Sequence, residues 1–350
     1  MIAAGFKQAA RAVIGRRATF LAGYMLRGAV AFVASGFQWN PAFPPECSVR
    51  YGKRHSQLFA NRTFAIFLLH ILRLRRVRQL TASLSCTSDG AGYQVLMRMR
   101  AMGFAKAEGL EYVHTPLFDI AHADCAMPEY CRKWEEMFRL GDGFRSVDRL
   151  DLGVLDFSWA PNSAIPDLFG RKDAALAIEA VIPDLKRRFR EANPRDRKAK
   201  APLDVCVHVR RGDISAETHP YMWTGDAKIR GAIASVRSCL DRLGADYTVT
   251  IVSLGEEAEF RQTFGPEIAY FLNEDSDAAV RRLAQADVLV MARSCFSYVA
   301  AIVSDGIRIY EDWDNPALAG WLVMAEDGSV DPEALAKAVR DRQAAKVAAD

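Results

Sequence analysis

The chain has 350 residues, half of them apolar and a quarter charged, which is typical of one or two packed domains and excludes a disordered chain, a coiled coil or a collagen-like fibre. The net charge of +3 hides an asymmetry: residues 1–80 carry thirteen Lys and Arg against one acid, Glu46, whereas the rest carries 33 basic and 42 acidic residues. This asymmetry indicates an anionic partner for the basic part, either nucleic acid or a membrane surface.

Residues 1–79 are expected to form a basic, amphipathic and largely helical segment. The apolar stretch 18–37 has Arg27 near its centre, which disfavours a membrane-spanning helix, and it lacks the cleavage site of a signal peptide. A second apolar run, 64–74, is too short to span a membrane. These runs fit either a segment that lies on anionic lipid or a buried helix with solvated flanks. Nucleic acid is disfavoured because the basic residues alternate with aliphatic runs and form no reading motif.

Residues 80–200 are predicted to form a first Rossmann-like domain. It opens with a strand, a Gly-rich turn, a helix and a second strand, at 80–86, 87–92, 94–108 and 110–113. We expect residues 126–185 to be mostly helical and loop-rich. The basic stretch 186–200 contains Pro194 and predicts the end of a helix followed by a linker between domains.

Residues 201–350 are predicted to form a second Rossmann-like domain. Strands are expected at 204–209, 247–253, 268–272, 287–292 and 307–310, and helices at 227–243, 256–264, 277–286 and 296–304. This alternation predicts an α/β fold with a parallel sheet covered on both faces. Ligands of such sheets bind beyond the carboxyl ends of the strands, so the residues that follow each strand are the candidate site.

The strongest candidate follows the strand DVCVHV, which leads directly into Arg210, Arg211 and Asp213. Arginines at the end of a buried strand suit an anion, because a guanidinium matches phosphate oxygens two at a time. His208 should point to the same side as Arg210. Either Asp213 or Glu217 could act as a general base, which accepts a proton from a reacting hydroxyl group. The alternative interpretation is a surface cluster of ion pairs.

Two helix N-termini are weaker candidates. Gly90 and Gly92 open a helix whose first turn contains Gln94, so a ligand could approach the backbone there, although a plain tight turn fits equally well. Ser294 and Ser297 follow another strand, where their hydroxyls could donate to a phosphate or simply cap the helix.

Metal binding is not expected. None of the seven cysteines has zinc-site spacing, and their odd number indicates reduced thiols in a cytoplasmic protein. Asp312 and Asp314 form a D-x-D pattern, which holds a divalent metal against a sugar diphosphate in some glycosyltransferases. This pattern leaves open a metal-dependent transferase that uses another sugar nucleotide.

Taken in order, these segments resemble the superfamily of α-1,2/α-1,6-fucosyltransferases and protein O-fucosyltransferases. Residues 208–213 match its H-x-R-R-x-D motif, and residues 89–94 are similar to its Gly-rich first loop. Residues 286–290 and 294–297 look like its third motif, usually written A-D and then S-S-F-S. The resemblance covers residues 84–310.

The resemblance implies a GT-B-type fold and inverting, metal-independent transfer from GDP-fucose, without a cofactor. It also implies that residues 80–200 form the acceptor-side domain and that residues 201–350 bind the nucleotide sugar. It implies that Arg210 holds the β-phosphate, with Arg211 and Asp213 beside it, and that His208 lies against the nucleotide. The two serines would contact the phosphate–sugar end, and the two glycines would let the first domain close over the pyrophosphate. In some members an Asp eight residues before the Asp of the A-D pair reads guanine, but this position is Ala279 here, which leaves the base open.

The leading expectation is therefore a fucosyltransferase-like enzyme that acts on a glycan or lipid-linked glycan at the cytoplasmic face of a membrane, with residues 1–80 docking to anionic lipid. The alternative of another class is a non-catalytic module that binds a nucleotide or an anionic polymer.

Overall fold

The computed structural model describes residues 78–82, 89–118, 120–146, 154–156, 176–195 and 202–348. Three predicted segments lie wholly or partly outside these residues. They are the basic segment 1–79 with its two apolar runs, of which only residues 78 and 79 are described, the end of the predicted strand 80–86, and the end of the predicted linker. Among the described helices, none combines the length and the apolar character that crossing a membrane requires.

The described chain forms an α/β fold with two parallel sheets, as the sequence predicts. The smaller sheet has the order β2-β1-β3, from β1 (Gln79–Thr81), β2 (Glu111–Tyr112) and β3 (Val154–Asp156). The larger sheet has the order β6-β5-β4-β7-β8-β9, from β4 (Leu203–His208), β5 (Tyr247–Ser253), β6 (Ala269–Leu272), β7 (Val288–Val290), β8 (Ile307–Tyr310) and β9 (Leu322–Val323). All pairs are parallel.

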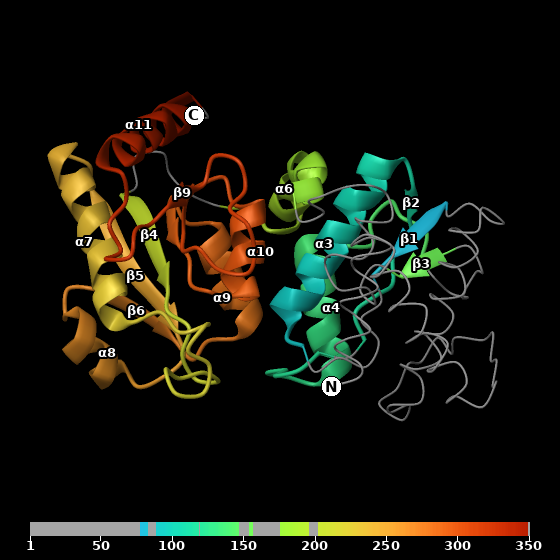
Figure 1. Cartoon of the computed structure of the whole chain (residues 1–350), viewed down its shortest axis with the longest axis horizontal. Helices are drawn as coiled ribbons and strands as arrows, with labels where there is room; N and C mark the ends of the chain where they lie inside the picture. The colour runs from blue at the N-terminus through green and yellow to red at the C-terminus, as the bar shows by residue number, and fades with distance from the viewer. Residues whose placement is uncertain are drawn as a thin grey trace, which may run out of the picture.

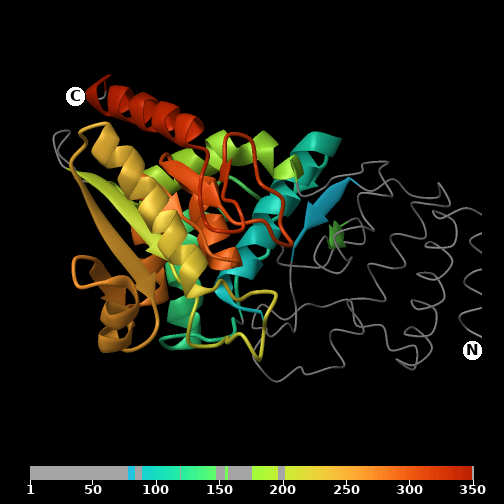
Figure 2. The ribbon, with the colours of Figure 1, turned by 60° about the vertical axis from the view of Figure 1, so that its left-hand side comes forward.

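Helices connect these strands and separate the two sheets (Figure 1). Those of the first part are α3 (Ala91–Glu108), α4 (Met127–Phe138), the short 3-10 helix η2 (Leu176–Val181) and α6 (Ile182–Ala192). Those of the second part are α7 (Asp226–Arg242), α8 (Glu257–Phe264), α9 (Ser276–Ala284), α10 (Cys295–Val303) and α11 (Pro332–Ala348), with α11 packed on α7 (Figure 2). The domain boundary expected at residue 200, between the two Rossmann-like domains, stays a prediction.

The five strands and four helices predicted between residues 204 and 310 are all present, with ends shifted by at most two residues. The β1–α3–β2 unit is also confirmed. The prediction for residues 126–185 missed β3, a strand of three residues, and β9 and α11 have no predicted counterpart. Short strands such as β3 carry too few residues to show a period.

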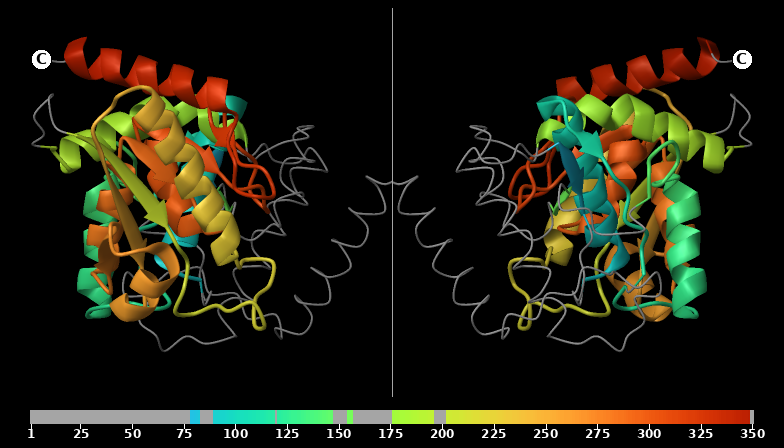
Figure 3. Two further views of the ribbon diagram at one scale, coloured as in Figure 1. Left: turned by 90° about the vertical axis from the view of Figure 1, so that its left-hand side faces the viewer. Right: turned by 90° about the vertical axis from the view of Figure 1, so that its right-hand side faces the viewer.

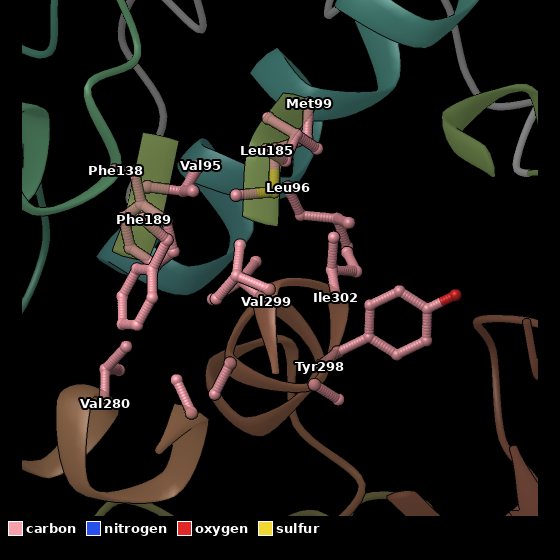
Figure 4. Packing of buried hydrophobic residues seen from close by; sticks show 14 of the residues in the cluster. Val95, Leu96, Met99, Phe138, Leu185, Phe189, Val280, Tyr298, Val299 and Ile302 are labelled. Atoms are coloured by element: carbon pink, nitrogen blue, oxygen red, sulfur yellow. The ribbon is translucent and has the colours of Figure 1, made fainter. Parts of the chain in front are cut away.

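One apolar core joins the two parts of the molecule. Residues 298–303 of α10 are all at most 2% exposed, and a helix that is buried on every side must have packing partners all around it. Figure 4 shows Val299 and Ile302 of α10 between residues from α3 and α6. A separate core lies on the other face of the larger sheet, under α7, α8 and α11.

The strand order reverses at the carboxyl end of β4, the place where open α/β sheets form a crevice for ligands. From β4 the chain proceeds to β5 and β6 on one side, then returns to β7 and β8 on the other side. Ligands of open α/β sheets bind at this kind of reversal. The loop that follows β4, drawn in yellow, extends beyond the carboxyl end of that strand (Figure 3).

Candidate active site

Arg210 stands at this reversal with its guanidinium held in place by Asp213. Its Nη2 donates to Asp213 Oδ2 at 2.7 Å, and its Nε donates to Oδ1 at 3.4 Å. The Arg210 side chain is 21% exposed, so part of its surface is open to a ligand. Burial alone would raise the pKa of the Asp213 carboxyl, but the hydrogen bond and charge of Arg210 outweigh burial and lower this pKa. Asp213 is therefore a weak base that orients Arg210.

The guanidinium of Arg211 contacts other groups of the protein than that of Arg210 does. Its guanidinium stacks over the Trp223 ring at 3.6 Å, donates to the Thr224 carbonyl at 3.1 Å and pairs with Asp226 at 2.6 Å. These contacts tie the loop 214–225 to the start of α7. The two arginines that the sequence groups together therefore separate into one that faces the crevice and one that holds a loop.

His208 is the last residue of β4, and its ring lies 5.5 Å from the ring of Phe296. Burial, followed by the charge of Arg210, lowers the pKa of His208 to about 3, so the imidazole is neutral. Within the described part of the chain, Nδ1 of His208 is buried and has no hydrogen-bond partner. A polar ligand group placed beside β4 could satisfy this atom.

The Gly-rich loop lies against the N-terminus of α10. The carbonyl of Asp89 accepts a hydrogen bond from Ala121 N at 3.2 Å, and Gln94 Nε2 donates to the same carbonyl at 3.1 Å. A Cβ added to Gly92 would lie 2.7 Å from Phe296 N. Gly92 is therefore required for close packing of α3 on α10, and that side of the residue is closed to a ligand by the α10 backbone.

We expect Gly92→Ala to lower the free energy of unfolding by about 1–3 kcal/mol, because the added methyl group must push two helix N-termini apart. Gly90→Ala is the matched control: its Cβ would lie 4.0 Å from the Ala121 carbonyl, and its φ of −71° suits any residue. Urea unfolding of both variants measures the difference. Equal stability of the two variants would show that the helices separate at little cost.

The two predicted serines use their hydroxyl groups inside the protein. Ser294 caps α10 by accepting a hydrogen bond from Phe296 N at 3.2 Å. Ser297 is fully buried, and its hydroxyl accepts from Ala292 N and donates to the Ala292 carbonyl. Between them lies Cys295, whose pKa is raised to about 11 by burial, so the thiol stays protonated. The hydroxyls of both serines thus support the loop between β7 and α10.

The remaining predicted carboxylates lie at the surface or in ion pairs. Glu217 is exposed and accepts a hydrogen bond from the Ser215 hydroxyl, which lowers the pKa of Glu217. Asp277, the acid closest to the guanine-reading position, is buried and pairs with Arg281 and with Lys133. Its carboxylate is therefore already occupied by two cations.

Asp312 and Asp314 are exposed, and the described residues contain no group of three or more His, Cys, Asp and Glu side chains placed to hold a metal. The structural carboxylate of this loop is Glu311, which the sequence analysis missed. Glu311 is 1% exposed and pairs with Lys228 at 3.1 Å and with Arg293 at 3.0 Å. Its position directly after β8 is the only sequence signal that could have identified it.

No family model and no curated protein matches this chain. Solved structures do resemble it. POFUT1 in complex with GDP is 13% identical, with a TM-score of 0.34, and the match covers 66% of this chain and 96% of that one. ADP-heptose lps heptosyltransferase II of E. coli is 11% identical, with a TM-score of 0.35 and coverages of 77% and 99%. Fucosyltransferase NodZ from Bradyrhizobium is 11% identical, with a TM-score of 0.31 and coverages of 73% and 98%.

Proposed function

We propose that this chain is an inverting, metal-independent glycosyltransferase of GT-B type that transfers fucose from GDP-fucose to a hydroxyl group of a glycan or lipid-linked glycan. The observation that carries the proposal is Arg210: a partly exposed guanidinium, oriented by Asp213, at the strand-order reversal of a parallel sheet. A guanidinium in this place suits a diphosphate, because it matches phosphate oxygens two at a time.

The chemistry of transfer needs such a cation. When the bond between the sugar and the diphosphate breaks, negative charge builds up on the departing phosphate oxygens. Arg210 can neutralise this charge without first rearranging, because Asp213 already fixes its orientation. The N-terminus of α10 adds a favourable dipole on the β7 side of the crevice. The neutral His208 offers an unpaired nitrogen to the nucleotide.

The location of the enzyme is part of the same proposal. The basic segment 1–79 would hold a cytoplasmic transferase at an anionic membrane surface, close to a lipid-linked acceptor. The residues proposed to bind the donor or to take part in transfer all lie at position 89 or beyond. The basic segment 1–79 would therefore serve only to dock the enzyme on the membrane.

A thermal-shift panel of GDP-fucose, GDP-mannose and ADP-, UDP-, dTDP- and CMP-sugars tests the donor. GDP-fucose is expected to give the largest rise in melting temperature, because only ligand that binds the folded state stabilises it, and the rise should persist in EDTA. A rise with UDP-sugars alone would overturn the donor. Loss of the rise in EDTA would instead favour a metal at Asp312 and Asp314, and binding without release of GDP would favour a non-catalytic module.

A further inference from the structure

Arg293 is a second arginine at the carboxyl edge of the larger sheet. It follows β7 and directly precedes Ser294, the N-cap of α10. Strands β4 and β7 are paired, with Val207 opposite Val290. Counting three residues on from this pair puts Arg210 and Arg293 level with each other. Neighbouring strands lie about 4.8 Å apart, so the two arginines leave the sheet side by side.

The guanidiniums of both arginines reach the same point of the loop 214–225. Arg293 Nη1 donates to the Tyr221 carbonyl at 3.4 Å, and Arg210 Nη1 lies 3.9 Å from Met222 Sδ. Tyr221 and Met222 are successive residues, so the two guanidiniums are near enough to contact one small ligand. Two like charges held next to each other attract an anion to the space between them.

The guanidinium of Arg293 is oriented from one side only. Its Nε forms an ion pair with Glu311 Oε1 at 3.0 Å, and Glu311 is itself 1% exposed and fixed by the Thr224 hydroxyl. Its Nη2 donates no hydrogen bond to any residue that the structure describes, and the side chain is 24% exposed. Arg293 is therefore held in place and still has donors to offer to a ligand.

The carboxylate of Glu311 balances only one of the two cations that contact it. Arg293 and Lys228 share its Oε1, so these three side chains carry a net charge of +1. Glu326 also lies 4.0 Å from Lys228, but it is fully exposed, and an ion pair in that setting contributes little. By contrast, the ion pair described above at the end of β4 is neutral. The unbalanced positive charge therefore lies on the β7 side of the site.

We propose, as an extension of the proposed transferase function, that Arg293 binds the β-phosphate of the sugar nucleotide together with Arg210. The two guanidiniums hold this phosphate from two sides, beside the N-terminus of α10, whose dipole favours the same charge. Asp213 already balances the charge of Arg210, so Arg293 supplies the positive charge that the phosphate still needs. The β-phosphate is also where negative charge collects during transfer.

The affinities of Arg293→Ala for GDP and for GMP, measured by titration calorimetry, test this role. Loss of a guanidinium that donates to a phosphate should weaken GDP binding by about 10–10²-fold. GMP lacks the β-phosphate, so its affinity should stay close to that of the wild type. Arg293→Lys should keep part of the GDP affinity, because an ammonium retains the charge but not the paired donors.

Lys228→Ala is the matched control, because it removes the other cation from the same oxygen of Glu311. The Lys228 ammonium extends toward Glu326, on the loop after β9, and not toward the loop 214–225. Each alanine variant leaves Glu311 with one cation and the Thr224 hydroxyl, so both should fold, and a melting curve of each checks this. Lys228→Ala should keep the wild-type affinity for GDP.

Three results would overturn the inference and leave the proposed function standing. They are a wild-type GDP affinity in Arg293→Ala, an equal loss of GDP and GMP affinity in that variant, and an equal loss of GDP affinity in Lys228→Ala. The last result would show that the balance of charge around Glu311, and not the donors of Arg293, controls binding. A wild-type chain that binds neither GDP nor GDP-fucose would overturn the proposed function itself, and the inference with it.

Discussion

Replacing Arg210 with alanine should lower the rate of fucose transfer, or of GDP release from GDP-fucose, by about 10²–10³-fold. The side chain is the oriented cation at the end of β4, and its loss would leave the diphosphate charge without its main counter-charge during bond cleavage. The melting temperature should change little, because among the described residues the guanidinium is bonded to the partly exposed Asp213 and weakly to Met222 Sδ at 3.9 Å. Initial rates with GDP-fucose, and a melting curve of each protein, measure the two effects.

Arg211→Ala is the matched control, because it removes the same kind of side chain from the adjacent position. Arg211 stacks on Trp223 and pairs with Asp226, so its removal should loosen the loop 214–225 and lower stability. Arg210→Lys should recover only part of the rate, since an ammonium keeps the charge but loses the paired donors. A folded Arg210→Ala protein with the wild-type rate would remove Arg210 from the chemistry.

The sheet and the position of the crevice were predictable because strands and helices alternate with clear periods in residues 201–310. Every residue of β4 is buried, which matches its near-continuous apolar sequence and its place in the centre of the sheet. The residues after β4 could therefore be assigned to the carboxyl edge from sequence alone.

The different roles of the individual residues, however, could not be predicted from the sequence. Whether Arg210 or Arg211 faces the crevice depends on where Trp223 lies, and that depends on the path of an irregular loop. Gly92 looked like a residue that admits a ligand, but the backbone of α10 fills the space next to it. Such long-range contacts leave no period or spacing in the sequence.

Glu311 was missed for the same reason. Glu311 stands next to the more conspicuous D-x-D pattern, yet the structure buries Glu311 and exposes the two aspartates. Its importance comes from two cations, Lys228 and Arg293, that are distant in sequence.

Glu311→Gln should produce the largest loss of stability, about 3–5 kcal/mol in the free energy of unfolding, because it removes the buried counter-charge that two partly buried cations share. Lys228 and Arg293 are 13% and 24% exposed, and both contact Glu311 Oε1. The Thr224 hydroxyl donates to the other oxygen of Glu311. These partners come from α7, from the loop after β7 and from the loop after β4, so one carboxylate joins three segments that border the crevice.

Urea unfolding of Glu311→Gln measures this loss, with Asp312→Asn as the matched control. Asp312 is the exposed neighbour, and its substitution should change stability by no more than about 0.5 kcal/mol. Since Arg293 also donates to the Tyr221 carbonyl, freeing it should loosen the loop 214–225, and the thermal shift by GDP-fucose should shrink in Glu311→Gln alone. If the two variants unfold at the same urea concentration, the cations must find other partners, and the carboxylate does not hold the edge of the site together.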